Sequence, residues 1–215
     1  PAQENLLLAA GSPDKVLLIG FKNPALKKYT GMSLAQVAKL RGTSPEDTAI
    51  DLVIEDGTRV GTVYFLMDEA NVARQTGLPW MAFGSDAEAQ APEGAFLLSS
   101  THPRAYGNVS RLLGKYVRAE NKATLPDAIR RLTSFPATNL GITDRGLLKA
   151  GNYADVVVFD PATIIDHATY EKPQQLSTGV DHVYVNGVQV LNDGKPTGKA
   201  AGRFVKGPGA GKCAS

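Results

Sequence analysis

The sequence lacks the features on which three common classes of protein depend. It contains one cysteine, Cys213 in a glycine-rich tail, so it can form no internal disulfide and no site built from several thiolates. Its longest apolar runs are about eight residues, far short of the roughly 20 that a membrane-spanning helix needs. The formal net charge is only +2, and no dense run of lysine and arginine offers a nucleic-acid surface. We therefore expect no membrane and no nucleic acid as partner.

What the sequence does contain is typical of a globular protein. Its 215 residues are 43% hydrophobic and 20% charged, which suffices for one large domain or two small ones. The chain begins at Pro1, without a methionine and without a signal-peptide pattern. We expect that an earlier segment is missing or removed and that the protein is cytoplasmic.

Apolar runs alternate with helical patterns over the first two thirds of the chain. Short apolar runs bounded by turn residues predict buried strands at residues 15–20, 61–67 and 78–83. Helical spacing and capping residues predict helices at residues 34–41, 45–55, 68–75, 107–119 and 125–134. Because strands that alternate with helices form parallel sheets, we expect an α/β fold with a parallel sheet.

The pattern changes near Arg145, where β-branched residues become frequent. Residues 154–161 predict a strand, and residues 182–190 predict a hairpin with Asn186-Gly187 as its type I′ turn. These elements indicate a small antiparallel β module with a loosely ordered tail. We expect the α/β part to occupy residues 1–142 and the β module with its flexible tail to occupy residues 143–215.

The candidate chemistry follows the third predicted strand. Gly84-Ser85-Asp86 comes directly after it, and His102-Pro103-Arg104-Ala105-Tyr106-Gly107 follows a loop rich in alanine, proline and serine. A buried strand that delivers an acid to a loop is how parallel α/β barrels place catalytic groups. Such a barrel needs eight strands, so we expect either the C-terminal portion of a larger fold or a partner that supplies the other strands.

These motifs resemble those in the C-terminal half of the D-aminoacylase (N-acyl-D-amino-acid deacylase) group of the amidohydrolase superfamily. The likeness covers nearly the whole chain. Gly151-Asn152-Tyr153-Ala154-Asp155 with its valine-rich continuation, and the later Val185-Asn186-Gly187, are typical of the superfamily in general. The run from His102 to Gly107 after Gly84-Ser85-Asp86 is narrower and favours the deacylase group.

The resemblance implies the C-terminal part of a (β/α)8 metal-dependent hydrolase barrel, with part of a small β-sandwich module beside it. It also implies one or two zinc ions in the complete enzyme. Most zinc ligands of the resembling enzymes are expected before Pro1, in a missing segment or in a separate chain that supplies the N-terminal half of the barrel. The histidines present, His102, His167 and His182, lack the spacing to replace them.

The resemblance assigns roles to two residues. Asp86 would contact the metal, take a proton from the metal-bound water and pass it to the leaving amine, which is work for a carboxylate. Arg104 would bind the free carboxylate of the substrate through two hydrogen bonds. From the residues alone, a turn or helix-cap aspartate is the favoured interpretation of Asp86, and a surface arginine on a loop is the alternative for Arg104. We interpret His102 as a packing residue of its loop or as a supporting residue of the site.

The favoured function is therefore zinc-dependent hydrolysis of the amide bond of N-acyl-D-amino acids by the complete enzyme. A cyclic amide or a dipeptide is the alternative substrate within the superfamily. Outside enzymology, the chain could be a non-catalytic fragment, a partner or a scaffold half, or a small binding module at residues 146–205. Since catalytic zinc needs three protein ligands, we expect the 215 residues alone to be inactive.

Overall fold

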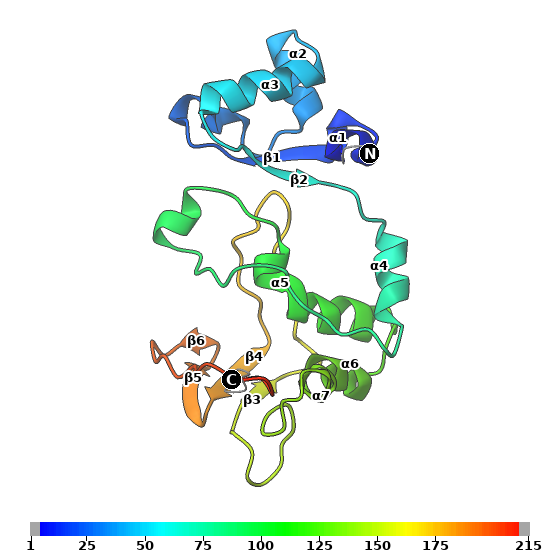
Figure 1. Cartoon of the computed structure of the whole chain (residues 1–215), viewed down its shortest axis with the longest axis vertical. Coiled ribbons are helices and arrows are strands. Elements are labelled where there is room, and N and C mark those ends of the chain that lie inside the picture. Colours follow the sequence, from blue (N-terminus) through cyan, green and yellow to red (C-terminus); the bar gives the residue numbers. More distant parts are fainter. Residues whose placement is uncertain (1–4, 211–215) are drawn as a thin grey trace, which may run out of the picture. The chain divides into compact units, whose positions relative to one another are not determined.

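The computed structural model describes residues 5–210 and divides into two compact units (Figure 1). Unit 1 holds the described residues up to Glu69 together with Asp86–Tyr106 and Ala168–Gln175. Unit 2 holds Ala70–Ser85, Gly107–His167 and the described residues from Leu176 onward. Cys213 lies outside the described residues. The expected domain boundary at residue 142 stays a prediction.

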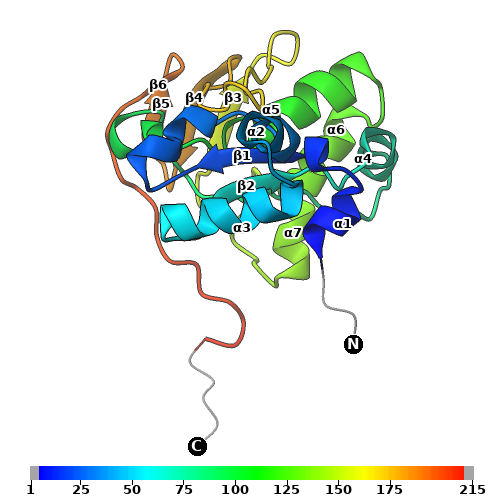
Figure 2. The ribbon, with the colours of Figure 1, turned by 90° about the horizontal axis from the view of Figure 1, so that it is seen from above.

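Unit 1 consists of a two-stranded sheet covered by short helices. Its elements are α1 (Leu6–Ala10), η1 (Pro13–Lys15), β1 (Val16–Gly20), η2 (Pro24–Tyr29), α2 (Leu34–Arg41), α3 (Pro45–Asp56), β2 (Gly61–Tyr64) and η3 (Gly94–Leu97). Figures 1 and 2 show α2 and α3 beside the β1–β2 pair. Valine, leucine and phenylalanine side chains from these elements form one core: Val16, Leu18, Phe21, Leu26, Leu34, Val37 and Leu52.

Helices α2 and α3 confirm the local predictions, whereas α1 and the short helices η1, η2 and η3 were not predicted. Ser33 and Gln36 form a capping box at the start of α2, and the side chain of Ser44 accepts a hydrogen bond from the backbone N–H of Asp47 at the start of α3. Gly57, with φ 64°, ends α3 in the left-handed conformation that glycine adopts without strain. Local sequence is sufficient for these boundaries because each cap involves residues only three or four positions apart.

The expected parallel pairing of β1 and β2 is wrong: the two strands are antiparallel, with Gly20 opposite Gly61. A parallel pair would require the chain to return to the start of β1. Instead, the end of α3 is fixed beside the end of β1. The backbone N–H of Asn23 donates to Asp56 Oδ1 at 2.8 Å, and Asn23 Nδ2 donates to the carbonyl of Glu55 at 2.9 Å. The chain therefore re-enters the sheet where β1 ends.

Unit 2 contains the remaining helices and a second sheet. Its elements are most of α4 (Glu69–Thr76), the greater part of α5 (Arg104–Arg111), the π-helix η4 (Leu112–Ala119), α6 (Leu125–Leu132), α7 (Ser134–Asn139), β3 (Val156–Phe159), β4 (Val180–Val185), β5 (Val188–Asn192) and β6 (Lys195–Pro196). Helix η4 packs closely on the segment after β3, since a Cβ on Gly114 would lie 2.6 Å from the carbonyl oxygen of Ile164.

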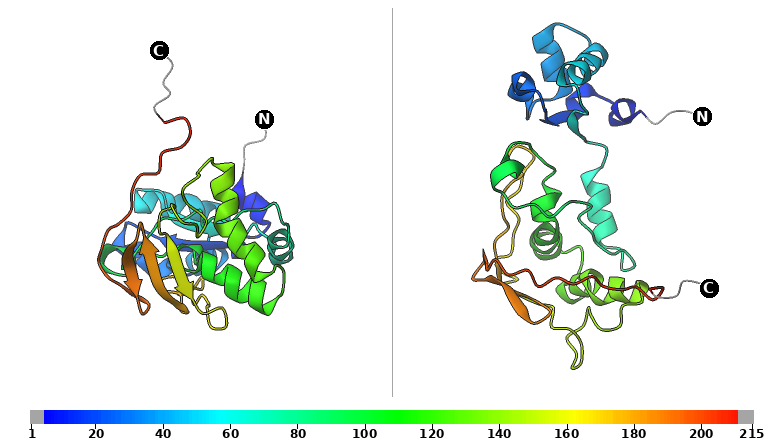
Figure 3. Two further views of the ribbon diagram at one scale, coloured as in Figure 1. Left: turned by 90° about the horizontal axis from the view of Figure 1, so that it is seen from below. Right: turned by 60° about the vertical axis from the view of Figure 1, so that its left-hand side comes forward.

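The four strands of unit 2 form one antiparallel sheet in the order β3-β4-β5-β6 (Figure 3). The predicted strand at residues 154–161 and the predicted hairpin are confirmed. Asn186 and Gly187 have φ values of 51° and 79°, as a type I′ turn requires. The short strand β6 was not predicted, because its two residues carry no alternating pattern.

The third predicted strand, at residues 78–83, is wrong. This segment is irregular and pairs with no strand among the described residues. Its carbonyl groups are bound by arginine side chains of α6. Arg130 Nη2 donates to the oxygen of Pro79 at 2.8 Å, and Arg131 Nε donates to the oxygen of Met81 at 2.7 Å. In a strand, these backbone carbonyls would accept hydrogen bonds from a neighbouring strand. Here they accept hydrogen bonds from the guanidinium groups instead.

Every helix in the described part of the chain is too short or too polar to cross a bilayer.

Candidate functional site

Asp86 lies in a turn after the irregular segment of residues 78–83, in unit 1. Its backbone has φ 46°, in the left-handed region that few residues other than glycine and asparagine or aspartate adopt. Its side chain is 90% exposed. Such backbone strain is common at functional sites, where surrounding contacts hold the conformation.

Arg104, the first residue of α5, lies beside Asp86. Its Nη2 atom is 2.8 Å from Asp86 Oδ2, and its side chain is 43% exposed. An exposed ion pair of this kind contributes little to folding stability. The contact is more informative about the site, because it places both residues predicted from the sequence within reach of one small molecule.

The backbone just ahead of Asp86 is held within unit 2. Asn108 Nδ2 donates to the carbonyl of Gly84 at 3.1 Å. Asn108 follows Arg104 by four residues on α5, and residues four apart lie on the same face of a helix.

The segment before the turn is fixed by Arg131, whose side chain is completely buried. Arg131 Nη1 donates to the carbonyl of Thr76 at 2.7 Å and to Asp127 Oδ2 at 3.3 Å, and the guanidinium carbon lies 4.3 Å from the ring centre of Phe83. Burial alone would raise the pKa of Asp127, but hydrogen bonds from Arg130 and Arg131 outweigh burial and lower it. This network anchors the chain ahead of Gly84.

His102 lies at the entry to α5, in unit 1. Its Nδ1 accepts a hydrogen bond from the backbone N–H of Arg104 at 3.0 Å, and its Nε2 lies 3.3 Å from the hydroxyl of Tyr170. The rings of His102 and Tyr170 meet edge to face with centres 5.2 Å apart, and Tyr170 meets Phe65 in the same way at 4.7 Å.

The described residues do not complete a zinc site. No group of three histidine, cysteine, aspartate or glutamate side chains within residues 5–210 is placed to hold a metal ion. Catalytic zinc is bound by three protein ligands and keeps one open position. Asp86 could supply at most one ligand, and its carboxylate is paired with Arg104.

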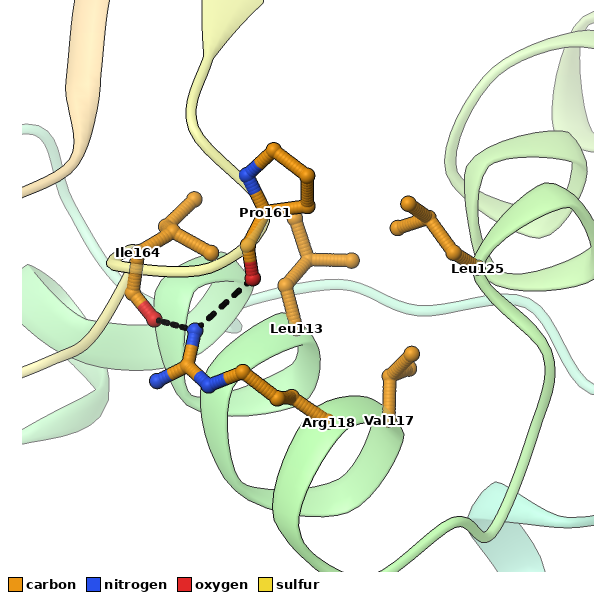
Figure 4. Close-up of a pocket in the computed structure, with 6 residues that line it drawn as sticks. All are labelled: Leu113, Val117, Arg118, Leu125, Pro161 and Ile164. Atoms are coloured by element: carbon orange, nitrogen blue, oxygen red, sulfur yellow. Dashed lines mark hydrogen bonds between the residues drawn. The ribbon is translucent and has the colours of Figure 1, made fainter.

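Two hollows lie in unit 2. One, of about 190 Å³, has apolar walls apart from Arg118, whose Nη1 donates to the carbonyls of Pro161 and Ile164 (Figure 4). The other, of about 320 Å³, lies beside Tyr153 and Phe204. Of the described residues that line the first hollow, only Arg118 has a titratable side chain, whereas the second is lined by Asp144, Tyr153 and Lys206 among others. Among the described residues, neither hollow is lined by a histidine or a cysteine.

Two other carboxylates near the superfamily motif have structural partners. Asp155 accepts a hydrogen bond from the backbone N–H of Asn186 at 2.8 Å and pairs with Arg145. Asp160 accepts from the backbone N–H of Ala162 at 2.8 Å, and this bond and the hydroxyl of Thr163 lower its pKa. Both residues therefore have a structural role in their turns.

The sequence did not identify Asn108 and Arg131 as part of this arrangement. The four-residue spacing between Arg104 and Asn108 was not a usable signal, because the predicted helix began at Gly107, after Arg104. Arg131 gave a weak signal, its position four residues after Asp127 on a predicted helix. Its complete burial follows from long-range packing and has no local signature.

Comparison with known proteins places the chain in a family. The model of the amidohydrolase family matches residues 33–191. The chain is 36% identical over 197 residues to a D-aminoacylase of Alcaligenes xylosoxydans xylosoxydans, covering 89% of this chain and 38% of that protein. It is 38% identical over 176 residues to an N-acyl-D-glutamate deacylase of the same organism, covering 82% and 33%.

Solved structures agree with this assignment. A D-aminoacylase with a binuclear metal centre superposes with a TM-score of 0.74 at 35% identity, covering 87% of this chain and 37% of that chain. The N-acyl-D-glutamate deacylase of Bordetella bronchiseptica, complexed with zinc and a phosphonate mimic of the tetrahedral intermediate, gives 0.72 at 35%, covering 88% and 38%. The chain thus spans less than two fifths of the length of these relatives. It belongs to the amidohydrolase family, in the group of the D-aminoacylases.

Proposed function

We propose that this chain contributes a proton-transfer group and a carboxylate-binding group to the hydrolysis of N-acyl-D-amino acids. Asp86 accepts a proton from the attacking water and donates it to the nitrogen of the leaving amine. Arg104 binds the free carboxylate of the substrate through its planar guanidinium. The preference for D-amino acids is supported by the names of the relatives, which include an N-acyl-D-aspartate deacylase that is 40% identical over 149 residues.

The observation that carries the proposal is the 2.8 Å separation between Arg104 Nη2 and Asp86 Oδ2. In an N-acyl α-amino acid, the amide nitrogen and the carboxylate are attached to the same carbon atom. A group that binds the carboxylate must therefore lie close to the group that protonates the nitrogen. The two side chains satisfy this requirement, and Arg104 has further N–H donors for a substrate.

We propose zinc as the cofactor of the complete enzyme, with Asp86 as one ligand. The support is the zinc-bound deacylase structure and the binuclear metal centre of the related D-aminoacylase. Because the described residues do not complete a zinc site, the remaining ligands and the rest of the barrel must come from a segment or a chain beyond residues 5–210. The cytoplasmic location expected from the sequence stays a prediction.

A cyclic amide is the second candidate substrate. The chain is 28% identical over 180 residues to a dihydroorotase of Lactobacillus acidophilus, covering 80% of this chain and 34% of that protein. This identity is lower than that of the deacylases, and we place the cyclic amide second. If an enzyme containing this chain hydrolysed a cyclic amide and no N-acyl-D-amino acid, the cyclic amide would become the first candidate substrate.

The test is a chimaera in which this chain replaces the matching part of the Alcaligenes D-aminoacylase. We expect zinc-dependent release of the amino acid from at least one of N-acetyl-D-leucine, N-acetyl-D-glutamate and N-acetyl-D-aspartate. Asp86→Asn should lower kcat by a factor of about 10² to 10⁴, the usual contribution of a general acid–base group. An Asp86→Asn chimaera with the kcat of the unmodified chimaera would contradict the proposal.

Asp193 provides a matched control. It also has a positive φ, 47°, and an exposed side chain, but it lies in the turn between β5 and β6. Asp193→Asn should leave kcat unchanged. The pair of variants separates loss of a catalytic carboxylate from the general effect of changing an aspartate in a strained turn.

A further inference from the structure

The imidazole of His102 has a hydrogen-bond neighbour at each ring nitrogen. Nδ1 accepts the backbone N–H of Arg104 at 3.0 Å, and Nε2 lies 3.3 Å from the hydroxyl of Tyr170. In addition, the backbone carbonyl of His102 accepts the N–H of Ala105 at 3.0 Å. His102 thus binds two successive N–H groups at the start of α5, as a helix-capping residue does.

This geometry assigns the tautomer of the ring. A backbone amide can only donate, so Nδ1 must be the unprotonated acceptor, and the single proton of the neutral ring is on Nε2. Nε2–H then donates to the hydroxyl oxygen of Tyr170. The edge-to-face contacts of Tyr170 with His102 and with Phe65 hold this hydroxyl in place.

We propose that His102 is a positioning residue for Arg104. Its Nδ1 fixes the backbone of Arg104, and the contact with Tyr170 fixes the ring, so that the guanidinium is presented beside Asp86. The inference rests on the proposed function, in which Arg104 binds the carboxylate of the substrate. It adds that the orientation of Arg104 depends on the imidazole of His102 and on the contact of that ring with Tyr170.

The first test needs no variant. Nitrogen-15 spectra of the histidine rings in the complete 215-residue chain distinguish the Nδ1–H from the Nε2–H tautomer. We expect His102 to be the Nε2–H tautomer near neutral pH, with unprotonated Nδ1. A ring protonated on Nδ1 could not accept the Arg104 N–H, and that result would overturn the proposal.

The second test compares two substitutions in the same chain by amide hydrogen exchange. His102→Ala should raise the exchange rate of the Arg104 amide about fivefold, the effect expected for loss of a helix cap. His102→Asn should restore protection, because asparagine offers a side-chain oxygen to the same N–H. Unchanged Arg104 exchange in His102→Ala would overturn the proposal.

His167→Ala is the control for this experiment. The His167 ring also has a hydrogen-bond neighbour, the hydroxyl of Thr178 at 2.9 Å, but both residues are in unit 2. This variant should leave Arg104 exchange unchanged. Circular dichroism of each variant confirms that the chain is folded, and the tautomer measurement decides the question if His102→Ala unfolds.

The third test uses the chimaera described above and separates this proposal from the proposed function. His102→Ala should raise KM for the N-acetyl-D-amino acid about tenfold with kcat little changed, and His102→Asn should restore KM. If Arg104→Ala raises KM and His102→Ala does not, the positioning role is wrong while the proposed function stands. If Arg104→Ala has no effect on KM, the carboxylate-binding role of Arg104 fails, and the tautomer and exchange results still decide whether His102 fixes this residue.

Discussion

At the scale of single residues, Asp86 is the most unusual position of the candidate site. It holds a left-handed backbone conformation and an almost fully exposed carboxylate at the same time. Neither feature stabilises a fold: the conformation is strained, and an exposed ion pair is worth little. Asp193 combines the same two features, so they do not by themselves mark a catalytic carboxylate. What distinguishes Asp86 is its ion pair with Arg104.

The strain at Asp86 can be measured directly. Asp86→Gly should be more stable than Asp86→Ala by about 1 kcal/mol, because alanine resists φ 46° and glycine does not. The free energies of unfolding in urea give this difference. The same pair of substitutions at Asp193, φ 47°, should show the same order. An alanine variant as stable as the glycine variant would show that the turn relaxes to another conformation in solution.

At the scale of elements, two arginines of α6 determine the path of the chain toward Asp86. Arg131 is buried and bonded to two carbonyls and a carboxylate, whereas the neighbouring Arg130 is partly exposed. Arg131→Met should reduce the free energy of unfolding by about 3 kcal/mol or more, since it leaves Asp127 without its buried partner and the carbonyls without donors.

Arg130→Met is the matched control, because it removes the same charge from the adjacent position. We expect a loss of about 1 kcal/mol or less for this partly exposed side chain. Urea unfolding of both variants checks the comparison. Equal losses in the free energy of unfolding for the two variants would show that the burial of Arg131 does not stabilise this segment.

Helices α2 and α3 are joined by a bidentate ion pair that makes their stability depend on pH. Arg41 Nη1 and Nη2 lie 2.6 Å and 2.9 Å from the two carboxylate oxygens of Glu55, and this hydrogen bonding lowers the pKa of Glu55 below its ordinary 4.5. A carboxyl whose pKa is lower in the folded state stabilises the fold above the unfolded pKa. That stabilisation is lost as the pH falls through the folded value.

The wild-type chain should therefore unfold at a higher urea concentration than Glu55→Gln near neutral pH, and the difference should vanish well below pH 4.5. Glu93→Gln is the control, because the side chain of Glu93 makes no capping hydrogen bond to η3. A difference between wild type and Glu55→Gln that persists unchanged in acid would contradict the role of the ionised carboxylate.

The sequence predicted the elements far better than their pairing. The caps at Ser33 and Ser44 and the Asn186-Gly187 turn are local, so α2, α3 and the hairpin were predicted correctly. The antiparallel pairing of β1 with β2 depends on Asn23 and Asp56, which are 33 positions apart. Residues 78–83 do not form the predicted strand, and the carbonyl of Met81 is bound instead by Arg131, 50 positions away. Contacts at such separation leave no periodicity in the sequence.

The same reasoning applies to the candidate site. The motif residues Asp86 and Arg104 were identified through the resemblance, and the structure brings them together. Their supporting residues were found only from contacts in space. Asn108, Tyr170 and Arg131 have no motif of their own, since an asparagine, a tyrosine or an arginine on a helix or loop is ordinary by composition.

At the scale of the whole molecule, the described residues do not form a complete metal site. It spans 38% or less of the length of the relatives described above, and residues 5–210 contain no group of three side chains placed to bind a metal. We expect the 215-residue polypeptide to bind no zinc tightly in a calorimetric titration and to release no amino acid from N-acetyl-D-leucine. Tight zinc binding with hydrolysis by this polypeptide alone would contradict the requirement for further ligands.

The measurement that tests the central claim most directly is the kcat of the chimaera with and without Asp86→Asn, with Asp193→Asn as control. The account predicts zinc-dependent hydrolysis of an N-acetyl-D-amino acid, a loss of about 10² to 10⁴ in kcat for Asp86→Asn and no loss for Asp193→Asn. Equal kcat values for all three proteins would contradict the assignment of Asp86 as the proton-transfer group.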